Sequence, residues 1–128
     1  MNFTNSETAL HYLEDKFERA MIPFVLLKNT AKNAVQNMNF DQDDPVEVGV
    51  VRKDYTESGR SILKMLLPEA EFGEDDIKLE HEGAPVHIKI INRNYKVFSN
   101  PDTVFYGVTE FRVPNPFKDY WKMRHLVR

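Results

Sequence analysis

The chain of 128 residues contains no cysteine, so disulfide bonds and thiolate chemistry are excluded. Its five glycines are scattered, and neither a nucleotide P-loop nor a dinucleotide-binding glycine fingerprint occurs. There is also no zinc-binding cysteine pair and no nucleophile elbow. These absences exclude four familiar classes of enzyme site.

The sequence also lacks long apolar runs and long blocks of one charge. No apolar run approaches the roughly 20 residues needed to cross a bilayer, so we expect no membrane partner. The first residues carry neither a basic cluster nor an apolar core, which predicts no secretory signal and favours a cytoplasmic location. The net charge of −3 gives no strong nucleic-acid signal, because nucleic-acid-binding domains are normally basic.

What is present predicts one folded domain over residues 1–128. Hydrophobic residues make up 41% of the chain, which is too many for a disordered tail and enough to bury a core. Apolar residues recur at three- and four-residue steps over 10–21, which predicts a helix capped by Thr4 or Ser6. Alternating valines predict a strand over 46–51, with Glu47 on the opposite face.

Further elements follow from the same periodicities and from the positions of prolines and capping residues. They are a strand over 22–27, a helix over 31–36 capped by Asn29 or Thr30, a helix begun by Asp54, Thr56 or Ser58 and stopped by Pro68, a loop over 69–76, a hairpin of strands over 77–80 and 86–91, short strands over 95–98 and 111–113, and a final helix from Phe117. This order predicts an α/β fold in which helices flank a mixed β-sheet.

An acidic segment over 41–47 runs directly into the predicted strand at 46–51. Hard cations such as Mg²⁺ prefer carboxylate oxygens that converge from a fixed backbone, and the mouth of a strand supplies such a backbone. Asp44 and Glu47 are therefore candidate metal ligands. The alternative interpretation is a solvated acidic turn that binds nothing.

His87 and Lys89 lie two residues apart on a predicted strand, so they share one face of it. They either line a site or belong to the wet face of an edge hairpin. The other histidines lack a partner at metal-ligand spacing and are predicted to be structural; they are His11, His81 and His125. The spacing of the C-terminal aromatic residues favours core packing over base stacking; they are Phe105, Tyr106, Phe111, Phe117, Tyr120 and Trp121.

Four short segments, spread along most of the chain from residue 23 to residue 117, follow one another in a recognisable order. Residues 23–35 look like a strand, turn and helix, residues 43–50 like a strand with paired acids, residues 86–90 like a later strand, and residues 111–117 like a strand, proline and closing helix. In this order and pattern they resemble the minimal nucleotidyltransferase superfamily, notably its phosphorylcholine-transferase branch.

The resemblance implies a turn that holds phosphate and a strand that holds metal. Lys28, Asn29 and Thr30 stand where the family has its glycine-rich turn, so the resemblance implies that they contact a nucleotide. Glu47 matches one of the paired acids, whereas Pro45 stands where the other would be. The resemblance therefore implies an Mg²⁺ site only if a neighbouring acid supplies the missing oxygen.

Asp44 is the acid that could supply it, and His87 or Lys89 stands where the family has its third carboxylate. This replacement predicts a catalytic set that has eroded. An opposite charge within about 4 to 6 Å of a carboxylate favours both ionised forms, so we expect Lys89 to pair with Glu47 in place of the missing cation.

Three hypotheses follow. The leading one is a nucleotidyltransferase-fold protein that is catalytically degenerate and acts by binding a nucleotide, a protein partner or a second copy of itself. The second is an active metal-dependent nucleotidyltransferase in which Asp44 and Glu47 bind Mg²⁺, beside His87 and Lys89. The third is a regulatory or structural interaction module of phage, other viral or mobile-element origin.

Overall fold

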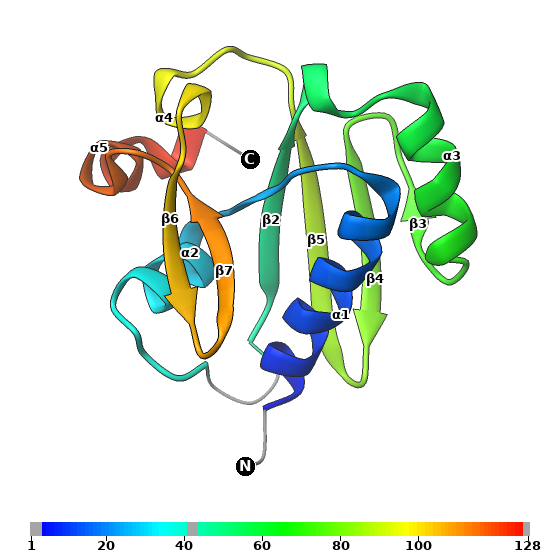
Figure 1. Cartoon of the computed structure of the whole chain (residues 1–128), viewed down its shortest axis with the longest axis horizontal. Helices are drawn as coiled ribbons and strands as arrows, with labels where there is room; N and C mark the ends of the chain where they lie inside the picture. The colour runs from blue at the N-terminus through cyan, green and yellow to red at the C-terminus, as the bar shows by residue number, and fades with distance from the viewer. Residues whose placement is uncertain (1–3, 41–43, 127–128) are drawn as a thin grey trace.

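The computed structural model describes residues 4–40 and 44–126. These residues form a seven-stranded mixed sheet flanked by helices (Figure 1), which confirms the predicted fold class. The strands are β1 (Val25–Leu26), β2 (Val46–Val51), β3 (Glu71–Phe72), β4 (Asp76–His81), β5 (Ala84–Ile91), β6 (Asp102–Tyr106) and β7 (Thr109–Val113). The helices are α1 (Asn5–Ala20), α2 (Lys28–Val35), α3 (Glu57–Leu66), α4 (Lys96–Ser99) and α5 (Phe117–Met123), with short 3₁₀ turns η1 (Arg52–Asp54) and η2 (Arg124–Leu126).

The strand order is β3-β4-β5-β2-β1-β7-β6. Strand β2 runs parallel to β5 and antiparallel to β1, and β1 runs parallel to β7. The predicted hairpin is confirmed, since β4 and β5 pair antiparallel around Glu82 and Gly83, both of which have positive φ. The sheet therefore places β2, which carries Glu47, between the hairpin and the short strand β1.

Helix α1 begins at a capping box. The Thr4 side chain accepts from the backbone N–H of Glu7, and the Glu7 carboxylate accepts from the backbone N–H of Thr4. This resolves the two capping alternatives in favour of Thr4. Ser6 has another role, because its hydroxyl donates to the carbonyl of Asp44 at 2.5 Å and so ties α1 to the start of β2.

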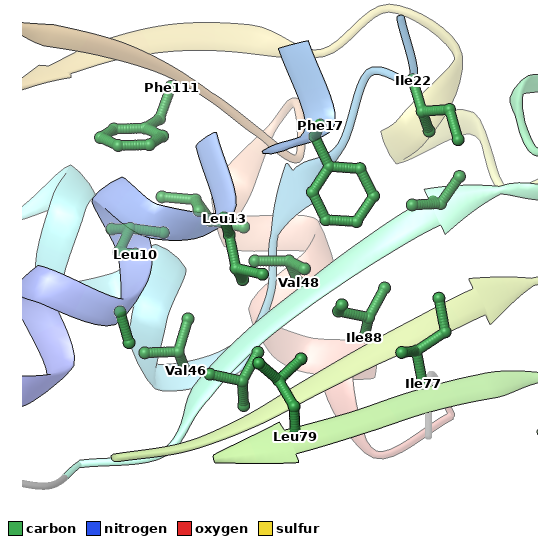
Figure 2. Packing of buried hydrophobic residues seen from close by; sticks show 14 of the residues in the cluster. Leu10, Leu13, Phe17, Ile22, Val46, Val48, Ile77, Leu79, Ile88 and Phe111 are labelled. Atoms are coloured by element: carbon green, nitrogen blue, oxygen red, sulfur yellow. The ribbon is translucent and has the colours of Figure 1, made fainter. Parts of the chain in front are cut away.

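The main core lies between α1 and the sheet (Figures 1 and 2). Alternate residues of β2 and β5, including Val48 and Ile88, pack beneath Leu10, Leu13 and Phe17 of α1. Alternation along a strand sends the intervening residues to the opposite face of the sheet. Burial of the apolar side chains thus decides which polar side chains of β2 and β5 share that face.

A second, smaller cluster of apolar side chains packs on α4 and α5. Its buried members are Val25, Leu27, Ile91, Val97, Phe98 and Tyr120. Side chains of α4, α5, β1 and the end of β5 meet there. The sheet beyond this cluster, at β4 and the middle of β5, is polar on the same face, since Lys78 is exposed and His87 is half-buried.

Several predicted boundaries were wrong. The strand predicted over 95–98 is replaced by the helical turn α4, Lys96–Ser99. Val97 and Phe98 both enter the second cluster, whereas consecutive strand residues point to opposite faces. The strand predicted over 22–27 is confined to β1. The predicted loop over 69–76 contains β3, and β6 was missed altogether.

Helix starts were predicted with mixed success. Thr56 caps α3 by accepting from the backbone N–H of Gly59, and α3 ends just before Pro68. Helix α2 begins at Lys28, three residues earlier than predicted, with Leu27 as its N-cap and no side-chain capping bond. Asn29 and Thr30 therefore lie inside the helix rather than at its cap.

The aromatic residues mostly follow the prediction of core packing. Tyr106, Phe111 and Tyr120 are buried, whereas Phe105 on β6 is exposed. His81 stacks on Tyr12 with ring centroids 3.9 Å apart, which is a packing role and agrees with the structural interpretation.

Candidate functional site

The turn between β1 and α2 has a backbone shape that favours glycine. Lys28 has a φ of 50°, in the left-handed region where a side chain is usually disfavoured. Its backbone N–H donates to the hydroxyl of Tyr120 at 2.7 Å, and Tyr120 is completely buried. The Tyr120 hydroxyl therefore supplies an acceptor for the first N–H of α2, a helix that has no side-chain cap of its own.

Glu47 lies directly beside this turn. Its carboxylate Oε2 is 3.3 Å from Nζ of Lys28, and its backbone carbonyl accepts from the N–H of Leu27 at 2.9 Å. Its own N–H donates to the hydroxyl of Thr30 at 2.9 Å. Thr30 is 3% exposed, so this bond is shielded from water. We call Lys28, Thr30, Glu47 and Tyr120 the Lys28–Glu47 site.

Glu47 lines two hollows, together with Pro45. The first, of about 260 Å³, is lined by Asn29, Thr30, Asn33, Phe40, Asp44, Pro45 and Glu47. The second, of about 390 Å³, is lined by Pro45, Glu47, Lys78, Leu79, Pro85, Val86 and His87. The structure thus brings Asn29, Thr30 and Asp44 together with Glu47 in one hollow and places His87 in the other.

Burial raises the pKa of Tyr120 still further above physiological pH. The pKa of its hydroxyl is raised to about 12, chiefly because the group is buried and also because the Glu47 charge is near, while the hydrogen bond from Lys28 opposes the rise. Tyr120 is therefore a neutral phenol at physiological pH. No local pattern predicts this contact, because Lys28 and Tyr120 are 92 positions apart.

His87 is the register partner of Glu47 in the parallel pair of β2 and β5, so the two share one face. Its Nε2 lies 3.3 Å from Oδ2 of Asp76, which is also 3.9 Å from Nζ of Lys78. The pKa of His87 is lowered, first by burial and then by the charges of Lys89 and Lys78, and the contact with Asp76 opposes this only in part. Asp76 lies on the same face of the sheet as His87 and Lys89, and the sequence did not identify it as a candidate site residue.

The lowered pKa of His87 predicts a loss of stability in acid. The unfolded chain binds a proton at His87 near pH 6.5, whereas the folded chain does so only at lower pH. The contribution of His87 to the free energy of unfolding is therefore complete above pH 6.5 and is lost as the pH falls through the folded pKa. Ring titration by NMR should give a pKa below 6.5, and the His87→Gln variant should lose less stability than the parent between pH 7 and 5. A folded pKa above 6.5 would contradict this.

The predicted partner of Glu47 was wrong. Lys89 lies opposite Gly49 in the β2–β5 register, so it shares the face of Glu47 as expected, but the ion pair of Glu47 is with Lys28. The hydrogen bond between Leu27 and Glu47 holds the turn after β1 against β2, whereas Lys89 lies two residues further along β5. The lysine that forms the ion pair with Glu47 therefore comes from the turn after β1 and not from β5.

The described carboxylates fit Mg²⁺ poorly. Asp44 and Glu47 line the same hollow, but Glu47 already contacts an ammonium group. Within residues 4–40 and 44–126 there is no group of three or more acidic or histidine side chains that could hold a metal ion. Mg²⁺ prefers six oxygen ligands in nearly ideal octahedral geometry. The acidic residues Asp41 and Asp43 lie outside the described part of the chain.

Comparison with known proteins does not assign this chain to a family. No protein-family model matches the chain, and no curated protein matches it either. Among the described residues, no helix is both long and apolar enough to span a membrane. What can be said of function therefore rests on the Lys28–Glu47 site.

Proposed function

We propose that this chain is a nucleotidyltransferase-like domain with a degenerate catalytic set, which acts by binding a nucleotide or a protein partner. Two features of the fold support the resemblance. Glu47 and His87 are paired residues of adjacent parallel strands, as two acids of one metal site would be. Lys28 has glycine-type backbone geometry in the turn where the family has glycine.

The Lys28–Glu47 ion pair carries the proposal of degeneracy. The Lys28 ammonium group lies 3.3 Å from the Glu47 carboxylate and competes with any divalent cation for the same oxygens. The lysine is 34% exposed and the glutamate 22% exposed, so solvent screens the pair in part. Pro45 supplies no carboxylate, and His87 is held by Asp76.

The size and lining of the first hollow support a binding role. Its volume of about 260 Å³ is below the 300 to 1,000 Å³ of typical small-molecule sites, so it suits part of a nucleotide, such as one phosphate group. Asn29 and Asn33 supply amide donors there. Thr30 already accepts from the backbone of Glu47, which leaves it less free to contact a ligand than the sequence predicted.

Two assays together test the proposal. The protein is incubated with each labelled nucleoside triphosphate, Mg²⁺ or Mn²⁺ and a cell extract as the source of acceptors. We expect no nucleotide transfer, and we expect a triphosphate to raise the melting temperature of the protein, less so for Asn29→Ala. Robust transfer would contradict degeneracy, and an unchanged melting temperature with every nucleotide would contradict nucleotide binding.

One observation favours the active enzyme as a second candidate: Asp44 and Glu47 line the same hollow. In that case Glu47→Gln and Asp44→Asn would each abolish the transfer measured above. A Lys53→Gln variant, altered at an exposed position outside this hollow, would keep it and serves as the control.

A further inference from the structure

A separate hollow of about 330 Å³ lies at the carboxyl end of β5. It is lined by Asp75, Lys89, Ile90, Ile91, Asn92, Arg93, Tyr95 and Leu126. It shares no lining residue with either hollow beside Glu47. Its volume falls within the range of typical small-molecule sites.

The charges that line this hollow are unbalanced. Lys89 and Arg93 make no ion pair and no side-chain hydrogen bond within the described part of the chain. The acid of the hollow, Asp75, is already neutralised, since its Oδ1 lies 2.6 Å from Nη2 of Arg52 and 3.0 Å from Nδ2 of Asn92. Two cations therefore remain for an anionic ligand.

The nearest acid on β4 is also engaged. Asp76 is the register partner of Lys89, yet its carboxylate contacts His87 at 3.3 Å and Lys78 at 3.9 Å. Lys89 is half-buried, which strengthens its attraction for an anion relative to a fully solvated lysine. The guanidinium of Arg93 can add a bidentate contact to a phosphate or carboxylate.

The lining of the hollow also includes apolar and aromatic side chains. Tyr95 packs edge-on against Phe98, with ring centroids 6.0 Å apart, so its ring is fixed in place. Leu126 is 57% exposed and lines the hollow together with Ile91. A ligand that contacted both kinds of side chain would carry an anionic group and a flat or apolar body.

We propose that this hollow binds a small organic phosphate monoester, with Lys89 and Arg93 on the phosphate and Tyr95 and Leu126 against the body. A phosphate monoester carries nearly two negative charges at pH 7 and so matches two unpaired cations better than a single carboxylate does. This inference does not rest on the proposed function, because the residues of the two sites are different.

An NMR titration of the full ¹⁵N-labelled chain tests it. The probes are AMP, inorganic phosphate and adenosine, each added to the parent and to Lys89→Gln/Arg93→Gln. AMP should shift the amides of Asn92, Arg93 and Tyr95 saturably, phosphate should do so more weakly, and adenosine least. The double variant should bind AMP at least tenfold more weakly than the parent.

The control removes two exposed charges elsewhere, in Lys53→Gln/Lys118→Gln, and should bind AMP as the parent does. The amide spectra also report whether each variant is folded. Equal weakening in both double variants, adenosine binding as tightly as AMP, or no shifts at this hollow would overturn the inference. Shifts confined to Asn29 and Thr30 would overturn it while leaving the proposed function intact.

Discussion

Replacing Tyr120 with alanine is expected to destabilise the fold by about 3 to 5 kcal/mol, the usual cost of truncating a buried aromatic residue. Tyr120 is completely buried, joins α5 to the second apolar cluster and accepts from the backbone N–H of Lys28 at 2.7 Å. The measurement is the free energy of unfolding in urea, with the slope of the transition checked against the parent.

Tyr120→Phe separates the hydroxyl from the ring. It keeps the packing but leaves the Lys28 N–H without its acceptor, which should cost about 1 to 3 kcal/mol. Tyr95→Phe is the matched control, because the Tyr95 hydroxyl makes no hydrogen bond within the described residues, and it should change the stability by less than about 0.5 kcal/mol. Equal stabilities for Tyr120→Phe and the parent would show that the hydroxyl does not support the turn.

Replacing Thr30 with valine is expected to cost about 1 to 3 kcal/mol, because the backbone N–H of Glu47 would lose its acceptor in a buried place. Valine has nearly the same shape, so the loss reports the hydroxyl. The same free energy of unfolding is measured, and Thr30→Ser, which restores the hydroxyl, should recover most of it. A valine variant as stable as the parent would mean that the Thr30 hydroxyl does not anchor β2.

The parts of the fold that were predicted from the sequence are those with strong local signals. Helix α1 has both an apolar period and a capping box, and the alternation of β2 correctly placed Glu47 opposite the buried valines. Strand β6 was missed because its first residues, Asp102 and Thr103, are polar and exposed at the edge of the sheet. Residues 95–98 look like a strand in isolation, but α4 forms at Lys96–Ser99, where Val97 and Phe98 pack into the same apolar cluster.

The candidate site was predicted in part for the same reason. Alternation along the strand is enough to put His87 and Lys89 on one face, and the β2–β5 register joins that face to Glu47. The choice of Lys28 as partner depends on the antiparallel pairing of β1 with β2 and on a left-handed residue in the turn. The pairing of β1 with β2 has no local signal in the sequence. The left-handed residue has none either, because lysine rarely adopts that conformation.

The claim that Lys28 has replaced a metal at Glu47 is tested most directly by titrating the ¹⁵N-labelled protein with Mn²⁺ and following paramagnetic loss of the amide signals. We expect no saturable loss centred on Glu47 in the parent. Lys28→Ala should show stronger loss there, because the carboxylate is released, whereas Lys32→Ala should behave as the parent does. Saturable loss of the Asp44 and Glu47 signals in the parent would contradict the account and point to a working metal site.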